Sequence, residues 1–289
     1  MVNHCNYIFI AAFGRSGSTL LASQLAEISG YESVGEFFPG IIWRNPSYQC
    51  SCGKSVDQCD FYSMIEELLS DEERQIIIQG DSLLNYNFGI RQKLSLMPIH
   101  QNFLSYIQNK FLVSEPLKKY AHLIGKLIPQ IVNHRGNSVF IDASKQYYLL
   151  NLYRNFGFKG IKIIHLYRNP LGVYASRKRT DNINIEKFCS SYNRYFNFNS
   201  DFIRYKNIDG YLEIDYDNLI MDNFDQIEKI KQFIGYNGGD CNKLISHIGG
   251  NVGRMKQNNL LRLDDRWKKE LSMKEINFIK ANTRYPNFD

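Results

Sequence analysis

The chain has 289 residues, of which 44% are hydrophobic and 22% are charged, and its formal net charge is +6. The hydrophobic content is too high and the charge too small for a disordered chain, and 7 Pro and 20 Gly exclude a collagenous sequence. The basic residues form no long run, so the charge favours a small polyanionic ligand or a solvated surface over a nucleic-acid duplex.

The first predicted element is a strand over 7–13, because seven consecutive apolar residues are typical of a strand buried on both faces of a parallel sheet. A glycine-containing turn follows at 14–19, and apolar residues then recur at helical spacing up to Gly30, which is a helix stop. The segment 60–135 is predicted to be mostly helical, with apolar residues on one face and acidic residues on the other.

Three later strands are predicted over 139–142, 161–167 and 211–215, and each precedes a predicted helix. This alternation predicts an α/β fold, a P-loop-like three-layer sandwich with a mostly parallel central sheet flanked by helices. We expect one domain over 1–289 with a helical insertion at about 60–135. Ligands of such folds bind beyond the carboxyl ends of the strands, where these turns lie.

The turn after the first strand has the composition of an anion-binding loop: Gly14, Arg15, Ser16, Gly17, Ser18 and Thr19. Glycines let backbone N–H groups converge, the next helix presents its positive end, and the hydroxyls and the guanidinium add donors. An ordinary glycine turn is the alternative, which the strand–turn–helix context disfavours. Because no lysine follows Gly17, a kinase or GTPase that binds a magnesium triphosphate is disfavoured as well.

This loop, Phe13-Gly-Arg-Ser-Gly-Ser-Thr-Leu-Leu21, resembles the 5′-phosphosulfate loop of sulfotransferases, whose donor is 3′-phosphoadenosine 5′-phosphosulfate (PAPS). In that family an arginine at a strand end and a serine eight residues later bind the 3′-phosphate, and Arg168 and Ser176 have this spacing. Independently of the resemblance, Asn169 and Pro170 are typical of a helix start, so Ser176 lies in the helix that would face a second anion.

The resemblance extends over about residues 6–270. The segment 139–145 resembles the family's strand that ends in Asp-Ser-Ser-Lys, 214–219 resembles its Tyr-Glu-Asp-Leu segment, and the tail resembles a late element of bacterial members. It implies that Arg254 contacts the 3′-phosphate or adenine, with a surface position as the alternative. The arginine in the loop resembles the carbohydrate and tyrosylprotein branch rather than the cytosolic small-molecule members, which carry a lysine there.

The activity that the resemblance implies is in-line transfer of a sulfuryl group from PAPS to an acceptor hydroxyl, without a metal. Positioned cations stabilise the charge of the transferring group, and a base takes the acceptor proton. We expect Glu36 to be this base, since the carbohydrate and tyrosylprotein branch carries a glutamate after the first helix; Glu32 is its nearest competitor, and a surface carboxylate is the alternative. Lys145 and Arg15 are the expected catalytic cations, although a solvated surface position is equally open for Lys145.

Three cysteines lie close together in the sequence, Cys50, Cys52 and Cys59, but neither their number nor their spacing matches a four-ligand zinc site. We therefore expect no metal, and free thiols or a local disulfide that borders the acceptor site are the alternatives. His165 lies inside an apolar strand, where a core histidine is favoured over a catalytic one.

The longest apolar stretches have seven residues, against about 20 for a membrane-spanning helix, and the first residues lack the basic region of a secretory signal. We expect a cytoplasmic enzyme with reduced thiols, whose acceptor is a small-molecule, glycan or lipid hydroxyl. The alternatives are a non-catalytic module that binds nucleotides or sulfated glycans and a nucleotide-dependent kinase; a dehydrogenase is disfavoured because Gly-x-Gly-x-x-Gly is missing.

Overall fold

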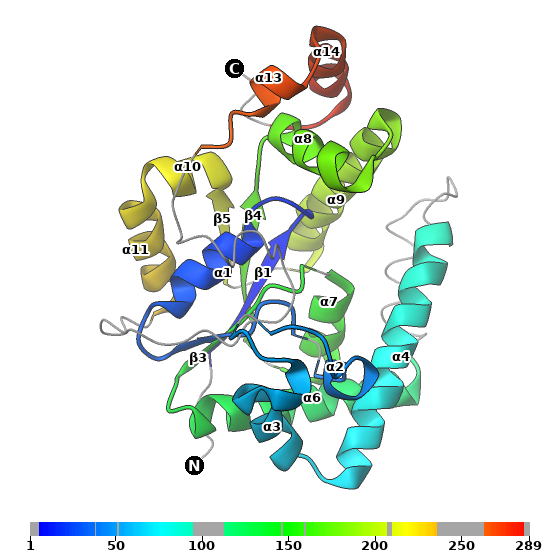
Figure 1. Cartoon of the computed structure of the whole chain (residues 1–289), viewed down its shortest axis with the longest axis vertical. Coiled ribbons are helices and arrows are strands. Elements are labelled where there is room, and N and C mark those ends of the chain that lie inside the picture. Colours follow the sequence, from blue (N-terminus) through cyan, green and yellow to red (C-terminus); the bar gives the residue numbers. More distant parts are fainter. Residues whose placement is uncertain are drawn as a thin grey trace.

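A parallel sheet of five strands forms the centre of the computed structural model, which describes residues 6–285 apart from 38, 51, 95–112, 146, 159, 207–209 and 236–262. The strand order is β2-β3-β1-β4-β5 (Figure 1), and every pair is parallel. The strands are β1 (Asn6–Ala12), β2 (Tyr31–Ser33), β3 (Val139–Asp142), β4 (Lys162–Tyr167) and β5 (Tyr211–Asp215). The predicted α/β class with a parallel central sheet is therefore confirmed.

Helices cover both faces of this sheet, which explains why β1 is apolar throughout. On one face, Ile8 and Ile10 pack with α1 (Ser18–Ala26), α10 (Tyr216–Met221) and α11 (Asn223–Ile234). On the other face, Tyr7 and Phe9 pack with α3 (Asp60–Glu67), α4 (Asp71–Leu94), α6 (Glu115–His134) and α7 (Tyr147–Phe156). The alternation of neighbouring β1 side chains between two apolar clusters fixes the strand in the middle of the molecule.

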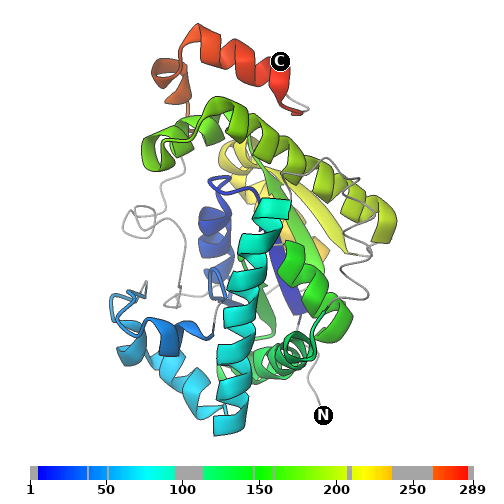
Figure 2. The same cartoon turned by 90° about the vertical axis from the view of Figure 1, so that its right-hand side faces the viewer.

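A third apolar cluster joins four helices near the carboxyl edge of the sheet (Figures 1 and 2). It contains α8 (Pro170–Asp181), α9 (Ile185–Lys206), α13 (Trp267–Glu270) and α14 (Met273–Asn282). The side chain of Asn169 accepts a hydrogen bond from the backbone N–H of Leu171 at 2.9 Å, so α8 starts where the sequence predicted.

The structure departs from the sequence prediction at three elements. The edge strand β2 and the helices α9 and α10 were not predicted. Of α10 and α11, which follow β5, α11 matches the predicted helix, which covers 222–234. A strand of three residues carries too little periodicity to be recognised from sequence. The segment 60–135 contains α3, α4 and α6, with 95–112 outside the described residues. Among the helices that are described, none has both the length and the apolar character of a membrane-spanning helix.

Candidate active site

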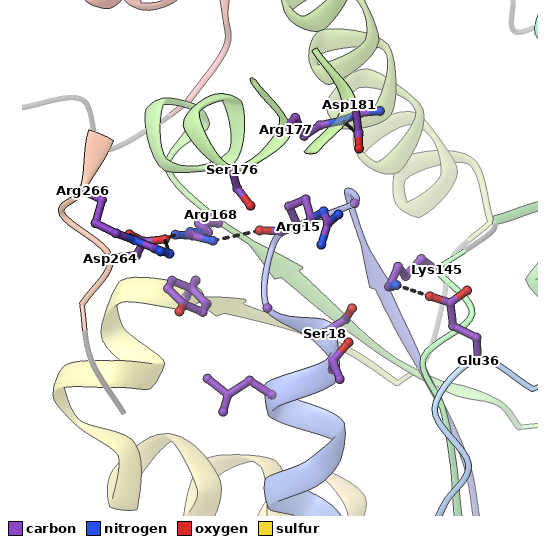
Figure 3. A pocket seen from close by; sticks show the side chains of 15 residues that line it. Arg15, Ser18, Glu36, Lys145, Arg168, Ser176, Arg177, Asp181, Asp264 and Arg266 are labelled. Atoms are coloured by element: carbon purple, nitrogen blue, oxygen red, sulfur yellow. Dashed lines mark hydrogen bonds and ion pairs between the residues drawn. The ribbon is translucent and has the colours of Figure 1, made fainter. Parts of the chain in front are cut away.

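A cavity of about 420 Å³ lies beyond the carboxyl ends of the strands (Figure 3). All five strands lead into it, because the carboxyl ends of parallel strands meet at one edge of the sheet. The sequence-predicted residues that line it are Gly14, Arg15, Gly17, Ser18, Thr19, Glu36, Lys145, Arg168 and Ser176. Residues that sequence analysis did not assign to the site also line it: Leu20, Arg177, Asp181, Tyr216, Asp264 and Arg266.

The loop between β1 and α1 has a backbone that few sequences adopt. Arg15 (φ 74°) and Gly17 (φ 96°) are both in the left-handed region, and Gly17 is the N-cap of α1. A Cβ atom at Gly17 would lie 2.5 Å from the ring of Tyr216, so both the conformation and the close packing require glycine. The backbone N–H groups of the first turn of α1 have no acceptor within the helix, and Ser18 and Thr19 line the cavity there.

Ser16 takes a different position from its neighbours in the loop. Its backbone N–H donates to the Phe13 carbonyl at 3.1 Å, its side chain is buried, and it is not part of the cavity wall. Arg254, the remaining residue expected to bind the donor, lies outside the described residues.

Arg168 is buried at the end of β4 and ties three parts of the site together. One guanidinium nitrogen donates to the carbonyl of Arg15 at 2.9 Å, and the guanidinium lies over the ring of Tyr216, 4.3 Å from its centroid. Gly172 leaves room for this side chain, because a Cβ atom there would approach the guanidinium to 3.2 Å. Within the described residues, Arg168 Nε is buried and has no hydrogen-bond partner, so a donor group stands ready for an anion.

Asp264 occupies another edge of the same guanidinium. It accepts from Arg168 at 2.9 Å and from two nitrogens of Arg266 at 2.7 and 2.8 Å. Burial alone would raise the pKa of Asp264, but hydrogen bonds from Arg266 and Arg168 outweigh it and hold that pKa well below its usual range. Asp264 is therefore a permanent carboxylate beside the arginine that the resemblance assigns to the 3′-phosphate.

Glu36 and Lys145 form an ion pair at the opposite side of the cavity, and both side chains are partly buried (Figure 3). Backbone pairing past the ends of β2 and β3 brings them together: Val34 donates to Ile141 at 3.3 Å and Ala143 to Gly35 at 2.6 Å. Lys145 has φ 66°, so it shares the left-handed conformation of Arg15. Such conformations cost free energy and cluster at functional sites.

A buried carboxylate, that of Asp142, stabilises the backbone next to the Glu36–Lys145 ion pair. Asp142, at the end of β3, accepts hydrogen bonds from Tyr7 Oη at 2.7 Å and from the backbone N–H of Ser144 at 2.7 Å, and it also bonds the Ser144 hydroxyl. The Ser144 hydroxyl in turn accepts from the backbone N–H of Phe37 at 3.0 Å. The chain after Glu36 is thereby fastened to the chain before Lys145.

Two further predictions concern residues near the cavity. Glu32, the competitor of Glu36, is buried in β2, where it accepts hydrogen bonds from Asn137 at 2.5 Å and Arg135 at 3.3 Å, and it does not line the cavity. His165 is a buried core residue, as predicted, with its Nδ1 2.7 Å from Tyr211 Oη.

Several missed residues carried a weak signal in the sequence. Arg177 and Arg266 belong to the two densest basic patches of the sequence, 177–179 and 266–269. Arg177 pairs with Asp181 at 3.1 Å in the cavity wall. Tyr216 and Asp264 lie within the two later segments that carry the resemblance. Their contacts with Arg168 join residues 48 or more positions apart, which no local pattern reveals.

Comparisons with known proteins show what the whole chain is similar to. Residues 6–282 match the family model described as the sulfotransferase domain. The sulfotransferase domain from the Synechococcus PCC 7002 olefin synthase has 18% identity and a TM-score of 0.50, with 96% of this chain and 95% of that chain covered. The sulfotransferase domain from the curacin biosynthetic pathway has 16% identity and a TM-score of 0.54, with 98% and 100% covered. A search of curated proteins gave no significant match.

The buried carboxyl of Asp142 makes stability depend on pH in a defined direction. Burial raises its pKa to about 6, against about 3.9 for an unfolded chain, so the native state holds the proton more tightly between these values. The free energy of unfolding of the native sequence should therefore fall, relative to Asp142→Asn, by about 1–3 kcal/mol between pH 4 and pH 7. Urea denaturation across this range measures the difference.

Asp181→Asn is the matched control, because a hydrogen bond from Thr180 and the contact with Arg177 lower the pKa of Asp181. The free energy of unfolding of the native sequence, relative to Asp181→Asn, should rise rather than fall between pH 4 and pH 7, and by a smaller amount. Parallel pH curves for the native sequence and Asp142→Asn would contradict the shifted titration of Asp142.

Proposed function

The chain belongs to the sulfotransferase family, and we propose that it transfers a sulfuryl group from PAPS to an acceptor hydroxyl, with Glu36 as the base. The observation that carries the proposal is the meeting of the anion-binding loop, Arg168, Ser176 and the Glu36–Lys145 pair in one cavity. The family match over residues 6–282 implies PAPS as the donor. The acceptor is proposed to be a hydroxyl of a small molecule, glycan or lipid.

The donor is proposed to bind with its two anionic ends at two helix starts. The 5′-phosphosulfate would lie against the first turn of α1, where Arg15 and Ser18 add side-chain donors. The 3′-phosphate would lie against α8, between Arg168 and Ser176. The buried Arg168 Nε, which lacks a partner within the described residues, supports this placement, because an anion there would satisfy it. Arg254 is proposed as a further contact of the 3′-phosphate or adenine.

The transfer step is proposed to use the Glu36–Lys145 corner. The acceptor oxygen forms a bond to sulfur, the bond from sulfur to the 5′-phosphate oxygen breaks, and adenosine 3′,5′-bisphosphate leaves. Glu36 takes the proton of the acceptor hydroxyl. Lys145 holds the Glu36 carboxylate in place and, together with Arg15, stabilises charge on the sulfuryl oxygens. Five cationic side chains and three acidic ones are among the described residues of the cavity wall, so the chain itself supplies positive charge to the donor.

The proposal predicts how the protein binds nucleotides. In calorimetric titrations, adenosine 3′,5′-bisphosphate should bind at least about tenfold more tightly than ADP, equally well with Mg²⁺ and with EDTA, because Arg168 and Ser176 recognise the 3′-phosphate. Ser176→Ala should weaken the binding of adenosine 3′,5′-bisphosphate without changing the affinity for ADP. Tighter binding of ATP with Mg²⁺ would favour the kinase alternative, and no binding of any nucleotide would contradict the donor site.

The role of Glu36 predicts a separation of turnover from binding. Glu36→Gln should lower kcat at least about 100-fold, because a general base contributes about this much or more, while the Kd for adenosine 3′,5′-bisphosphate changes less than about threefold. Turnover is measured as bisphosphate released from PAPS with a hydroxyl acceptor identified by screening.

Glu32→Gln is the control for this experiment, because Glu32 has the same chemistry but lies outside the cavity wall. The folded fraction of Glu32→Gln should have the kcat of the native protein. Full turnover in Glu36→Gln would remove Glu36 from the mechanism, and donor binding without turnover in the native protein would favour the non-catalytic module.

The contact between Asp264 and Arg168 predicts that removing this carboxylate increases the affinity for adenosine 3′,5′-bisphosphate. Its carboxylate competes with a phosphate for Arg168, so Asp264→Asn should tighten binding of adenosine 3′,5′-bisphosphate about three- to tenfold while ADP affinity stays nearly constant. The neighbouring Asp265→Asn makes the same change of charge at an exposed position and is the matched control. Equal effects of the two variants would show a general charge effect and contradict a specific competition at Arg168.

A further inference from the structure

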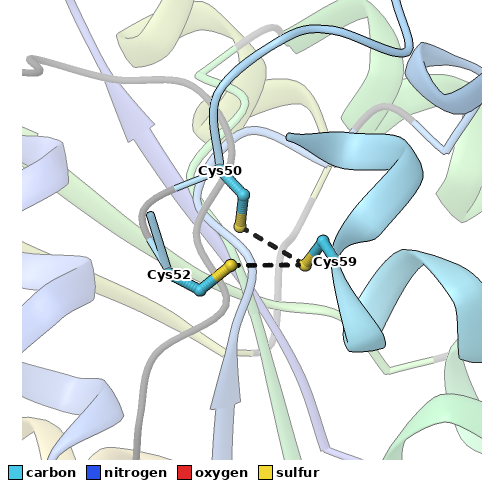
Figure 4. A group of neighbouring side chains, drawn as sticks. All are labelled: Cys50, Cys52 and Cys59. Carbon is cyan, nitrogen blue, oxygen red and sulfur yellow. Dashed lines mark hydrogen bonds between the residues drawn. The ribbon is translucent and has the colours of Figure 1, made fainter. Parts of the chain in front are cut away.

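Three cysteines that are up to nine positions apart in the sequence form a cluster away from the cavity (Figure 4). The Sγ atom of Cys59 lies 3.6 Å from that of Cys52 and 3.6 Å from that of Cys50, and all three sulfurs lie within 4.8 Å of one another. Cys50 and Cys59 are buried, and Cys52 is half-buried. The fold thus brings Cys59 to the Cys50–Cys52 pair, which the sequence spacing did not reveal.

The distances between the sulfurs match a metal site better than a disulfide. A disulfide bond needs about 2.05 Å between two sulfurs, and the two pairs that include Cys59 are both well beyond this value, at 3.6 Å. A zinc ion with bonds of about 2.3 Å to sulfur places tetrahedral ligands about 3.8 Å apart. We infer that Cys50, Cys52 and Cys59 bind one zinc ion as thiolates, at a site separate from the sulfuryl-transfer chemistry.

The backbone around the cluster is arranged as a tight turn. The backbone N–H groups of Cys52 and Lys54 lie near the sulfurs of Cys50 and Cys52 respectively. Gly53 has φ 88°, and its N–H donates to the Cys50 carbonyl at 3.0 Å, which closes the turn. Hydrogen bonds from backbone N–H groups to thiolates are a recurrent feature of metal–sulfur sites.

Positive and polar groups also lie near the three sulfurs. Cys59 is the N-cap of α3, so its sulfur lies near the positive end of an eight-residue helix. Lys54 lies close enough to interact with Cys52 and Cys59, and its charge is shared with Asp60 at 3.0 Å. The hydroxyl of Tyr62 is fully buried near Cys50 and Cys59 and has no hydrogen-bond partner within the described residues. Three thiolates around a divalent ion carry a net charge of −1, and the N-terminal end of α3 and Lys54 offset part of it.

The ligand set also indicates the kind of ion. Thiolates select zinc and other soft ions over Mg²⁺ and Ca²⁺, which prefer oxygen. Within the described residues, no fourth His, Cys, Asp or Glu joins the group. The fourth position of a tetrahedral ion is thus left for a water molecule or another small ligand.

The cluster has a structural connection to the rest of the molecule. Cys50 and Cys59 belong to the same apolar cluster as Phe37, the residue after Glu36, and as the helices α3, α4 and α6. An ion held by the three sulfurs would join the chain after α2 (Ile41–Arg44) to the start of α3 across the short helix η1 (Val56–Gln58). Binding energy of such an ion adds to the stability of the fold.

Metal analysis of the full-length protein, purified under reducing conditions, tests the inference. We expect about one zinc per chain by elemental mass spectrometry, and Cys52→Ser, at the half-buried position, should reduce this at least about tenfold. Cys189→Ser is the matched control, because Cys189 is a buried free cysteine outside the cluster. After zinc removal, Co²⁺ should give thiolate-to-metal charge-transfer absorption, and zinc should raise the Tm by about 5 °C or more.

Each other outcome contradicts the site. A native protein with less than about one-tenth zinc per chain that also shows no cobalt charge-transfer band has no such site. Equal zinc in the native protein and in Cys52→Ser places the metal elsewhere. A disulfide between two of the three cysteines that persists in reductant, found by mass mapping, likewise overturns the assignment. Circular dichroism of each variant reports whether its fold is intact, so that loss of metal and loss of folding are distinguished.

Discussion

The site depends on one constraint, the meeting of all parallel strand ends at a single edge of the sheet. β1 leads to Arg15, β2 to Glu36, β3 to Lys145, β4 to Arg168 and β5 to Tyr216, and all five side chains line the same cavity. Three of them are cations, and bringing like charges together in a partly buried space is unfavourable without counter-charges. The site therefore contains carboxylates that face the cations, and an anionic ligand is the natural addition to it.

The aromatic ring of Tyr216 fixes the positions of two of these strand ends relative to each other. Its ring packs against Gly17 and also lies under the guanidinium of Arg168. Arg168 reaches back to the carbonyl of Arg15, so the loop after β1 and the end of β4 are held by the same side chain. Arg15 and Lys145 keep left-handed backbones in this setting, because the surrounding contacts outweigh a cost of about 1–3 kcal/mol each.

The sequence predicted the elements and residues whose signal is local. The strands over 139–142 and 211–215 agree with the structure, and nine of the predicted site residues line the cavity, because a glycine loop and a helix start have short patterns. Asp264 was missed for the opposite reason, since its partner Arg168 lies in a distant segment of the chain. Glu36 and Glu32 differ only in which one follows the end of β2, and a strand of three residues gives too little periodicity to decide this from sequence.

Most charged residues of the cavity wall pair with one another, and this affects what the binding of an anion can gain. Lys145 pairs with Glu36, Arg168 with Asp264, and Arg177 with Asp181. An anionic donor thus exchanges one set of partners for another, so its net electrostatic gain is much smaller than the number of cations suggests. The exchange favours a ligand whose anionic groups lie at the right separation to meet the loop and Arg168 together. Under the proposed function, such a ligand would leave the Glu36 carboxylate able to turn from Lys145 to the proton of the acceptor hydroxyl. Under the proposed function, these ion pairs therefore make the affinity for the donor depend on the spacing of its charges.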